Sequence, residues 1–129
     1  MTKHIRPRLI VQDVDKAIEY YVTCLDAKPG ARHAEPSGLV VNAELTIGES
    51  DLTLAQAYDG YRLHSPRDLG GSPLLLTLTV DDATAVGNAM VDAGGSVIVP
   101  IEDRPYGKRQ GRIEDPFGHL WVVSQPLET

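Results

Sequence analysis

At two places in this chain, a segment of alternating apolar residues ends at an aspartate. Apolar residues at helical spacing follow the aspartate in both places. Residues 9–13 read Leu-Ile-Val-Gln-Asp, and residues 78–82, 69 positions later, read Leu-Thr-Val-Asp-Asp. The last aspartate of each segment, Asp13 or Asp82, suits the N-cap of the helix that follows. Two copies at this separation predict a duplicated supersecondary unit, because a solenoid needs three or more repeats.

The first copy predicts a strand, a helix and three further strands. Along residues 6–11, Leu9 and Val11 fall on one face of the strand, while Arg6 and Arg8 fall on the other. The helix should carry an apolar stripe of residues spaced three and four apart: Val14, Ala17, Ile18, Tyr21, Val22 and Leu25. Breakers at residues 28–30 should end this helix. The further strands are expected at residues 38–41, 43–47 and 51–58.

The second copy predicts the same order. In the strand at residues 74–80, Leu75, Thr77 and Thr79 share the face opposite the remaining leucines. A helix stripe follows Asp82 and ends at residues 94–95: Ala83, Val86, Met90 and Ala93. Strands are expected at residues 97–99, 111–114 and 120–124, the last two joined by a type I turn at Asp115-Pro116-Phe117-Gly118.

These elements predict an α+β fold of two β-α-β-β-β modules within a single domain that spans residues 1–129. Module one should occupy residues 1–66, and a linker with module two residues 67–129. The net charge of −6 disfavours nucleic acid as a partner. The absence of a run of about 20 apolar residues disfavours a membrane span. A lone cysteine, Cys24, excludes an internal disulfide, so we expect a cytoplasmic protein without a secretory signal.

Four segments of the chain together resemble the vicinal-oxygen-chelate superfamily, which includes glyoxalase I, bleomycin-resistance and fosfomycin-resistance proteins and extradiol dioxygenases. They are residues 9–13 leading to 17–21, residues 78–82, residues 105–109 and residues 115–121; the last two segments are similar to its PhnB-like branch. The resemblance implies sheets that curl into a cup around a ligand cavity, in a homodimer. Arg6, Arg8, Ile10, Leu75, Thr77 and Thr79 would then face that cavity.

The resemblance also implies where a divalent metal would be held. A His or Glu is expected on the first strand of each module, where this chain has Arg6 and Leu75, and a carboxylate on each last strand, near Thr53 or Ala55 and at Val122. None of these side chains is a usual ligand of such ions. The four histidines, His4, His33, His64 and His119, are expected at a chain end, in loops or beside a turn. We therefore expect no metal and no other cofactor.

Candidate ligand-binding residues are aromatic, hydroxyl and cationic. Tyr58, Tyr106 and Trp121 offer flat faces, Thr77 and Thr79 offer hydroxyl groups, and Arg6, Arg8 and Arg109 can pair with anionic groups. Alternatives stay open for several of them. Trp121 follows the alternation of its strand onto the helix side, and Tyr106 and Arg109 could stabilise a turn. Arg6 and Arg8 could pair internally with Glu44 or Glu102.

The preferred functional prediction is a metal-free small-molecule binding protein of the bleomycin-resistance type, such as one that sequesters an antibiotic or natural product. The alternative is a lyase, isomerase or dioxygenase of secondary metabolism. It would use a metal at an unusual site that includes His4 or His119, or no cofactor, with Arg6, Arg8 or Tyr106 polarising the substrate.

Overall fold

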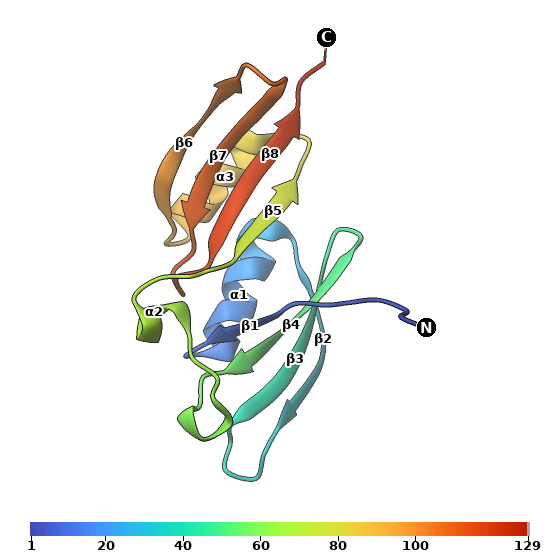
Figure 1. Cartoon of the computed structure of the whole chain (residues 1–129), viewed down its shortest axis with the longest axis vertical. Helices are drawn as coiled ribbons and strands as arrows, with labels where there is room; N and C mark the ends of the chain where they lie inside the picture. The colour runs from blue at the N-terminus through green and yellow to red at the C-terminus, as the bar shows by residue number, and fades with distance from the viewer. Residues whose placement is uncertain (129) are drawn as a thin grey trace. The chain divides into compact units, whose positions relative to one another are not determined.

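A computed structural model describes residues 1–128, so the predicted end of module two at Thr129 lies outside the described residues. The chain forms two compact units, residues 1–69 and residues from Gly70 onward. Each has the order β-α-β-β-β, as the duplication predicts (Figure 1). The α+β fold class is therefore confirmed.

The first unit contains β1 (Arg8–Val11), α1 (Val14–Leu25), β2 (Lys28–Ala34), β3 (Val40–Ile47) and β4 (Ser50–Gln56). A short 3-10 helix (Asp59–Tyr61) and α2 (Pro66–Leu69) follow β4. The second unit contains β5 (Leu75–Thr79), α3 (Ala83–Asp92), β6 (Ser96–Arg104), β7 (Lys108–Glu114) and β8 (Leu120–Pro126). Within residues 1–128, no helix has the length and apolar character needed to cross a bilayer.

Both sheets have four strands and the same connectivity, β1-β4-β3-β2 in one unit and β5-β8-β7-β6 in the other. The first and last strands of each unit pair in parallel, and the other pairs are antiparallel. The register repeats the sequence offset, because Arg8 pairs with Thr53 and Thr77 pairs with Val122, each 69 residues further along. In this pair of strands the duplication is thus preserved at single-residue level.

One helix packs on one face of each sheet. Helix α1 contacts β2, β3 and β4, and α3 contacts β6, β7 and β8. Leu9 and Val11 are buried while Arg8 is exposed, so the predicted alternation of β1 is confirmed. The other face of each sheet carries the residues of opposite parity and has no helix of its own unit upon it.

Helix α1 begins where the sequence predicts, since the Asp13 carboxylate accepts a hydrogen bond from the Lys16 amide at 3.1 Å. Its buried stripe differs from the prediction and consists of Val14, Ala17, Tyr20, Tyr21 and Cys24. Val22, expected in the stripe, is 38% exposed, and Leu25 is only half-buried. Tyr20 and Cys24 lie four residues apart on one face of the helix. The buried face therefore includes these two residues and not Val22.

The expected strand positions in the first unit were partly wrong. Residues 28–34 form strand β2, although Pro29 and Gly30 read as helix breakers, and β3 replaces two expected strands with one. Strand β2 lies at the sheet edge, where a proline without an N–H is tolerated. Its register shifts between Pro29 and Arg32, so the strand lacks the regular alternation from which strands are predicted.

The last three strands of the second unit, β6, β7 and β8, are longer than expected. Strand β6 runs to Arg104 and β7 begins at Lys108, so that residues 105–107 form a tight turn. Gly107 adopts a φ of 80°, which suits glycine in such a turn. Helix α3 follows its Asp82 N-cap as predicted, and it buries Ala83, Gly87 and Met90.

The turn between β7 and β8 is organised by the buried side chain of Asp115, which is 1% exposed. The amide of Gly118 donates to the Asp115 carbonyl at 3.1 Å, as expected for the predicted turn. The Asp115 carboxylate accepts from the amides of Phe117 and His119, at 2.9 and 3.0 Å, and from Trp121 Nε1 at 2.9 Å. One carboxylate therefore satisfies three donors of this hairpin.

We predict that Asp115→Ala lowers the free energy of unfolding by about 3 kcal/mol, because several donors in the turn lose a charged acceptor. Trp121 is the only tryptophan, so denaturant unfolding can be followed by its fluorescence. Glu49→Ala, in the exposed turn between β3 and β4, is the control and should change stability by no more than about 0.5 kcal/mol. Equal effects of the two substitutions would contradict this role of Asp115.

Candidate functional site

The open face of the first sheet holds a cationic hollow. Arg8 on β1 lies beside Thr53 on β4, which in turn lies beside Glu44 on β3. Arg8 Nε donates a hydrogen bond to Thr53 Oγ1 at 3.0 Å. A hollow of about 410 Å³ is lined by His4, Arg6, Arg8 and Thr53.

The two arginines of this hollow have no carboxylate partner within residues 1–69. Arg6 and Arg8 form no ion pair there, although Glu44 stands one strand beyond Thr53. The internal pairing with Glu44 that the sequence left open is therefore absent from the described part of this unit. The hollow presents positive charge together with the imidazole of His4.

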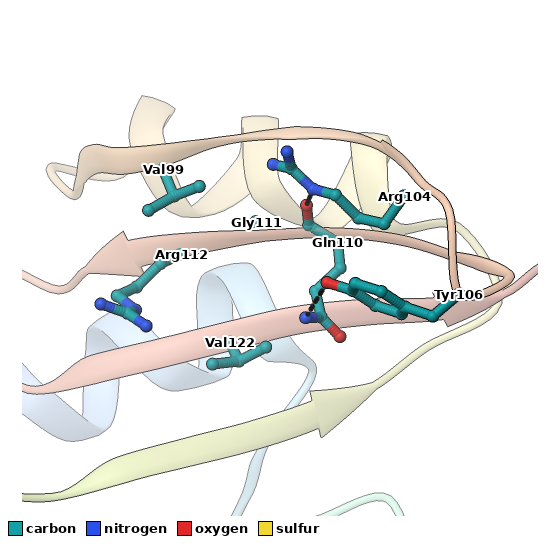
Figure 2. Close-up of a pocket in the computed structure, with 7 residues that line it drawn as sticks. All are labelled: Val99, Arg104, Tyr106, Gln110, Gly111, Arg112 and Val122. Carbon is teal, nitrogen blue, oxygen red and sulfur yellow. Dashed lines mark hydrogen bonds between the residues drawn. The ribbon is translucent and has the colours of Figure 1, made fainter.

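The open face of the second sheet also has a hollow, and Val122, the counterpart of Thr53, lines it. Val99, Arg112, Val122 and Thr77 form one cross-strand row over β6, β7, β8 and β5. A hollow of about 280 Å³ lies over the β6, β7 and β8 part of this sheet (Figure 2). Its side chains are Val99, Arg104, Tyr106, Gln110, Arg112 and Val122.

The polar groups of this second hollow divide into satisfied and unsatisfied ones. Gln110 Nε2 donates to the Tyr106 hydroxyl at 3.0 Å, and Arg104 Nε donates to the Gln110 carbonyl at 3.0 Å. A second nitrogen of Arg104 donates to the Pro100 carbonyl. Arg112 Nε, by contrast, is buried and has no hydrogen-bond partner among the described residues.

The absence of a side chain at Gly111 lets β6 bulge toward β7 beside the hollow. A Cβ at this position would lie 2.6 Å from the Val99 carbonyl oxygen and 2.7 Å from the Ile101 nitrogen, both of them backbone atoms. The register of β6 against β7 shifts on either side of Val99. Glycine here thus permits the bulge that brings Val99 beside Arg112.

Five predicted site residues lie on the open faces. Arg6 and Arg8 line the first hollow, and Tyr106 lines the second. Thr77 and Thr79 are exposed and alternate with half-buried leucines, so the predicted parity of β5 is confirmed. Thr77 extends the row of Arg112 and Val122 onto β5, and Thr79 lies beside Ser124.

Two predicted site residues lie elsewhere in the second unit. Arg109 has the opposite parity to Gln110 and Arg112 on β7, and its Nε is 2.7 Å from the Asp103 carboxylate. This hydrogen bond raises the pKa of Arg109 and lowers the pKa of Asp103. Trp121 is 3% exposed and hydrogen-bonded to Asp115, so it belongs to the core, as its alternation indicated.

Tyr58 lies in a surface cluster that lines neither hollow. Its ring meets the ring of Tyr61 edge-on, with centroids 4.8 Å apart. The Tyr61 hydroxyl donates to the Glu35 carboxylate at 2.6 Å, and this hydrogen bond raises the pKa of Tyr61. The cluster joins residues 58–63 to the end of β2, which is a structural role.

We predict that Glu35→Gln returns the pKa of Tyr61 toward the ordinary tyrosine value, because the neutral amide no longer opposes phenolate formation. The measurement is the ultraviolet phenolate titration, with Tyr61→Phe subtracted to isolate this residue. A raised pKa also means that the contact stabilises the fold below the ordinary tyrosine pKa and loses this effect as pH rises through the folded value. An unchanged Tyr61 titration in Glu35→Gln would contradict the contact.

Three polar residues of the second hollow, Arg104, Gln110 and Arg112, were not among the predicted site residues. The sequence pattern that could have identified Arg112 is its alternation with Ile113. Ile113 is 1% exposed and lies on the helix side of the sheet. That alternation places Arg112 and Gln110 together on the open face. Arg104 had no such signal, because the expected strand stopped at residue 99.

The positions at which the family resemblance would place metal ligands do not fit a divalent ion. They hold Arg6 and Thr53 in the first unit, and Leu75 and Val122 in the second. Only Thr53 carries an oxygen, which already accepts a hydrogen bond from cationic Arg8. Among residues 1–128, no three His, Cys, Asp or Glu side chains cluster closely enough to hold a metal. His119 is buried beside the Asp115 turn.

Two β-α-β-β-β units, each with a helix on one sheet face and a hollow on the other, define a duplicated scaffold with open sheet faces. The family model of the Glyoxalase/Bleomycin resistance protein/Dioxygenase superfamily matches residues 2–123. An uncharacterized protein of Mycobacterium bovis is 35% identical over 126 residues, which cover 95% of this chain and 83% of that protein. The chain belongs to the Glyoxalase/Bleomycin resistance protein/Dioxygenase superfamily.

Solved structures share the fold. Protein PA1353 from Pseudomonas aeruginosa is similar with a TM-score of 0.78 and 22% identity, over 98% of this chain and 100% of that one. The fosfomycin resistance protein FosX from Mesorhizobium loti is similar with a TM-score of 0.68 and 14% identity, over 100% of this chain and 94% of that one. At these identities the likeness concerns the fold alone.

Proposed function

We propose that this chain is a small-molecule binding protein of the bleomycin-resistance type, which holds its ligand on the open sheet faces without a metal. One observation carries the proposal. Thr53 and Val122, the matched last-strand positions where relatives would hold a metal ligand, each line a hollow whose charged side chains include two arginines. A site that would favour a cation in a metalloenzyme therefore favours an anionic or electron-rich ligand here.

The residues of the hollows support binding better than catalysis. Arginine and tyrosine groups can orient a ligand by hydrogen bonds and ring contact. A proton-transfer enzyme needs a base within hydrogen-bond reach of its substrate. In the part of the chain that the structure describes, His4 is the only conventional base lining either hollow, and neither is lined by a carboxylate.

The finer form of the proposal is sequestration of an antibiotic or natural product by a homodimer in a reducing compartment. Bleomycin resistance in the family description and fosfomycin resistance in the name of FosX indicate suitable ligand classes to test. Assignment to the PhnB-like branch belongs to the same proposal and rests on residues 105–109 and 115–121. Exposed Val97 and Ile98 on edge strand β6 offer apolar surface for a second copy.

We predict that purified protein contains no stoichiometric metal, and that neither chelator nor added divalent ions change its melting temperature. The measurements are elemental analysis and thermal-shift assays, run with a panel that includes bleomycin, fosfomycin and small carbonyl compounds. A bound compound present at about 100 times its dissociation constant should add about 2.7 kcal/mol to stability.

Two outcomes would contradict the proposal. One is a tightly held metal at one equivalent per chain. The other is conversion of a stabilising compound to a product, followed by mass spectrometry. Loss of that conversion in Arg8→Gln with binding retained would instead favour a cofactor-independent enzyme.

A further inference from the structure

We propose that Arg112 is the anchor for a carboxylate group of the ligand, and that the ligand's apolar body lies along Val99 and Val122. This inference rests on the proposed binding function and adds to it the chemical class of the ligand. It is carried by the geometry of one cross-strand row in the second unit, together with the unsatisfied state of one side chain in that row.

Arg112 is placed in the middle of an otherwise apolar stretch. It is directly opposite Val99 on β6 and Val122 on β8, and all three side chains line the hollow (Figure 2). Neighbouring residues across a sheet have Cβ atoms about 5 Å apart, so the valines flank the arginine stem on both sides. The row therefore presents one cation bordered by two apolar surfaces.

The charge of Arg112 has no partner among the described residues. Arginine keeps its positive charge in proteins, and a buried donor without an acceptor is unfavourable. Arg112 Nε is buried and unpaired, and no carboxylate forms an ion pair with this side chain in the described part of the chain. An incoming oxyanion would supply the missing acceptor.

Arg104 shows by contrast what a satisfied arginine in this hollow looks like. Its guanidinium donates to backbone carbonyls of Gln110 and Pro100, and it lies 3.8 Å from the Glu102 carboxylate. Its groups are therefore engaged in holding the bulged hairpin together. Of the two arginines in this hollow, Arg112 is the one left available to a ligand.

The chemistry and size of the hollow narrow the ligand further. The guanidinium fork matches the planar geometry of a carboxylate through two parallel hydrogen bonds. A hollow of about 280 Å³ is at the small end of ligand sites, which suits a compact body of one or two rings. Tyr106 and Gln110, which are hydrogen-bonded to each other, offer further polar contacts in the same hollow.

The test compares 2-naphthoate with 2-naphthamide, two probes with the same apolar body and different charge, by isothermal titration calorimetry. Wild-type protein should bind the carboxylate about tenfold or more tightly than the amide, the difference expected for a charge-assisted hydrogen bond. Arg112→Gln should abolish this preference. Arg112→Lys should retain part of it, because the charge remains while the fork is lost.

The matched control is Arg109→Gln, on the same strand but the opposite face, which should keep the full preference. Trp121 fluorescence and the melting temperature report whether each variant folds. If Arg112→Gln does not fold, Arg112→Lys is the deciding variant, and its preference for the carboxylate should be lower than that of the wild type.

Equal binding of both probes by the wild type would overturn the carboxylate anchor and leave the binding function standing. Failure of both probes to bind would count against the two proposals together. A preference lost in Arg8→Gln but kept in Arg112→Gln would overturn the assignment to this hollow.

Discussion

A single helix can cover only one face of a four-stranded sheet, and this constraint decides where ligand chemistry is possible in each unit. Helices α1 and α3 take the faces that bear Leu9 and Trp121, and these faces are sealed by close packing. The opposite faces keep every second residue of each strand free of that packing. Polar and charged residues can accumulate there without disturbing the core, and both hollows lie on this side.

Side chains alternate along a strand, so the two arginines of β7 lie on opposite faces of the sheet. Arg109 turns away from the hollow and pairs with Asp103, whereas Arg112, three residues later, lines it. Both are arginines on one short strand, so residue type alone does not separate their roles. The separation comes from Ile113 and Val123, whose burial fixes which parity faces the helix.

Features that depend on local chemistry could be predicted from the sequence. The N-caps at Asp13 and Asp82, the turn at Asp115 and the alternation of β5 each follow from a few adjacent residues. Features that depend on neighbouring strands could not. Strand β2 contains Pro29 and an irregular register, and its pairing with β3 gives it strand character despite those residues. The bulges of β6 likewise interrupt its register, so its full length could not be predicted. The place of Arg104 in the second hollow could not be predicted for the same reason.

The duplication relates the two cross-strand rows: Arg8 corresponds to Thr77, and Glu44 corresponds to Arg112. The arginine of each row therefore stands on a different strand and has different neighbours. In the first unit, the row through Thr53 ends in Arg8, whose Nε already donates to the Thr53 hydroxyl, and the arginine is exposed. Water can satisfy the rest of an exposed guanidinium, so little is gained when a ligand replaces it. In the second unit, the matched row puts valines beside Arg112 and withholds a partner from its buried nitrogen. We therefore expect an anion to gain more at Arg112 than at Arg8, since it would complete a group that the protein itself leaves unsatisfied.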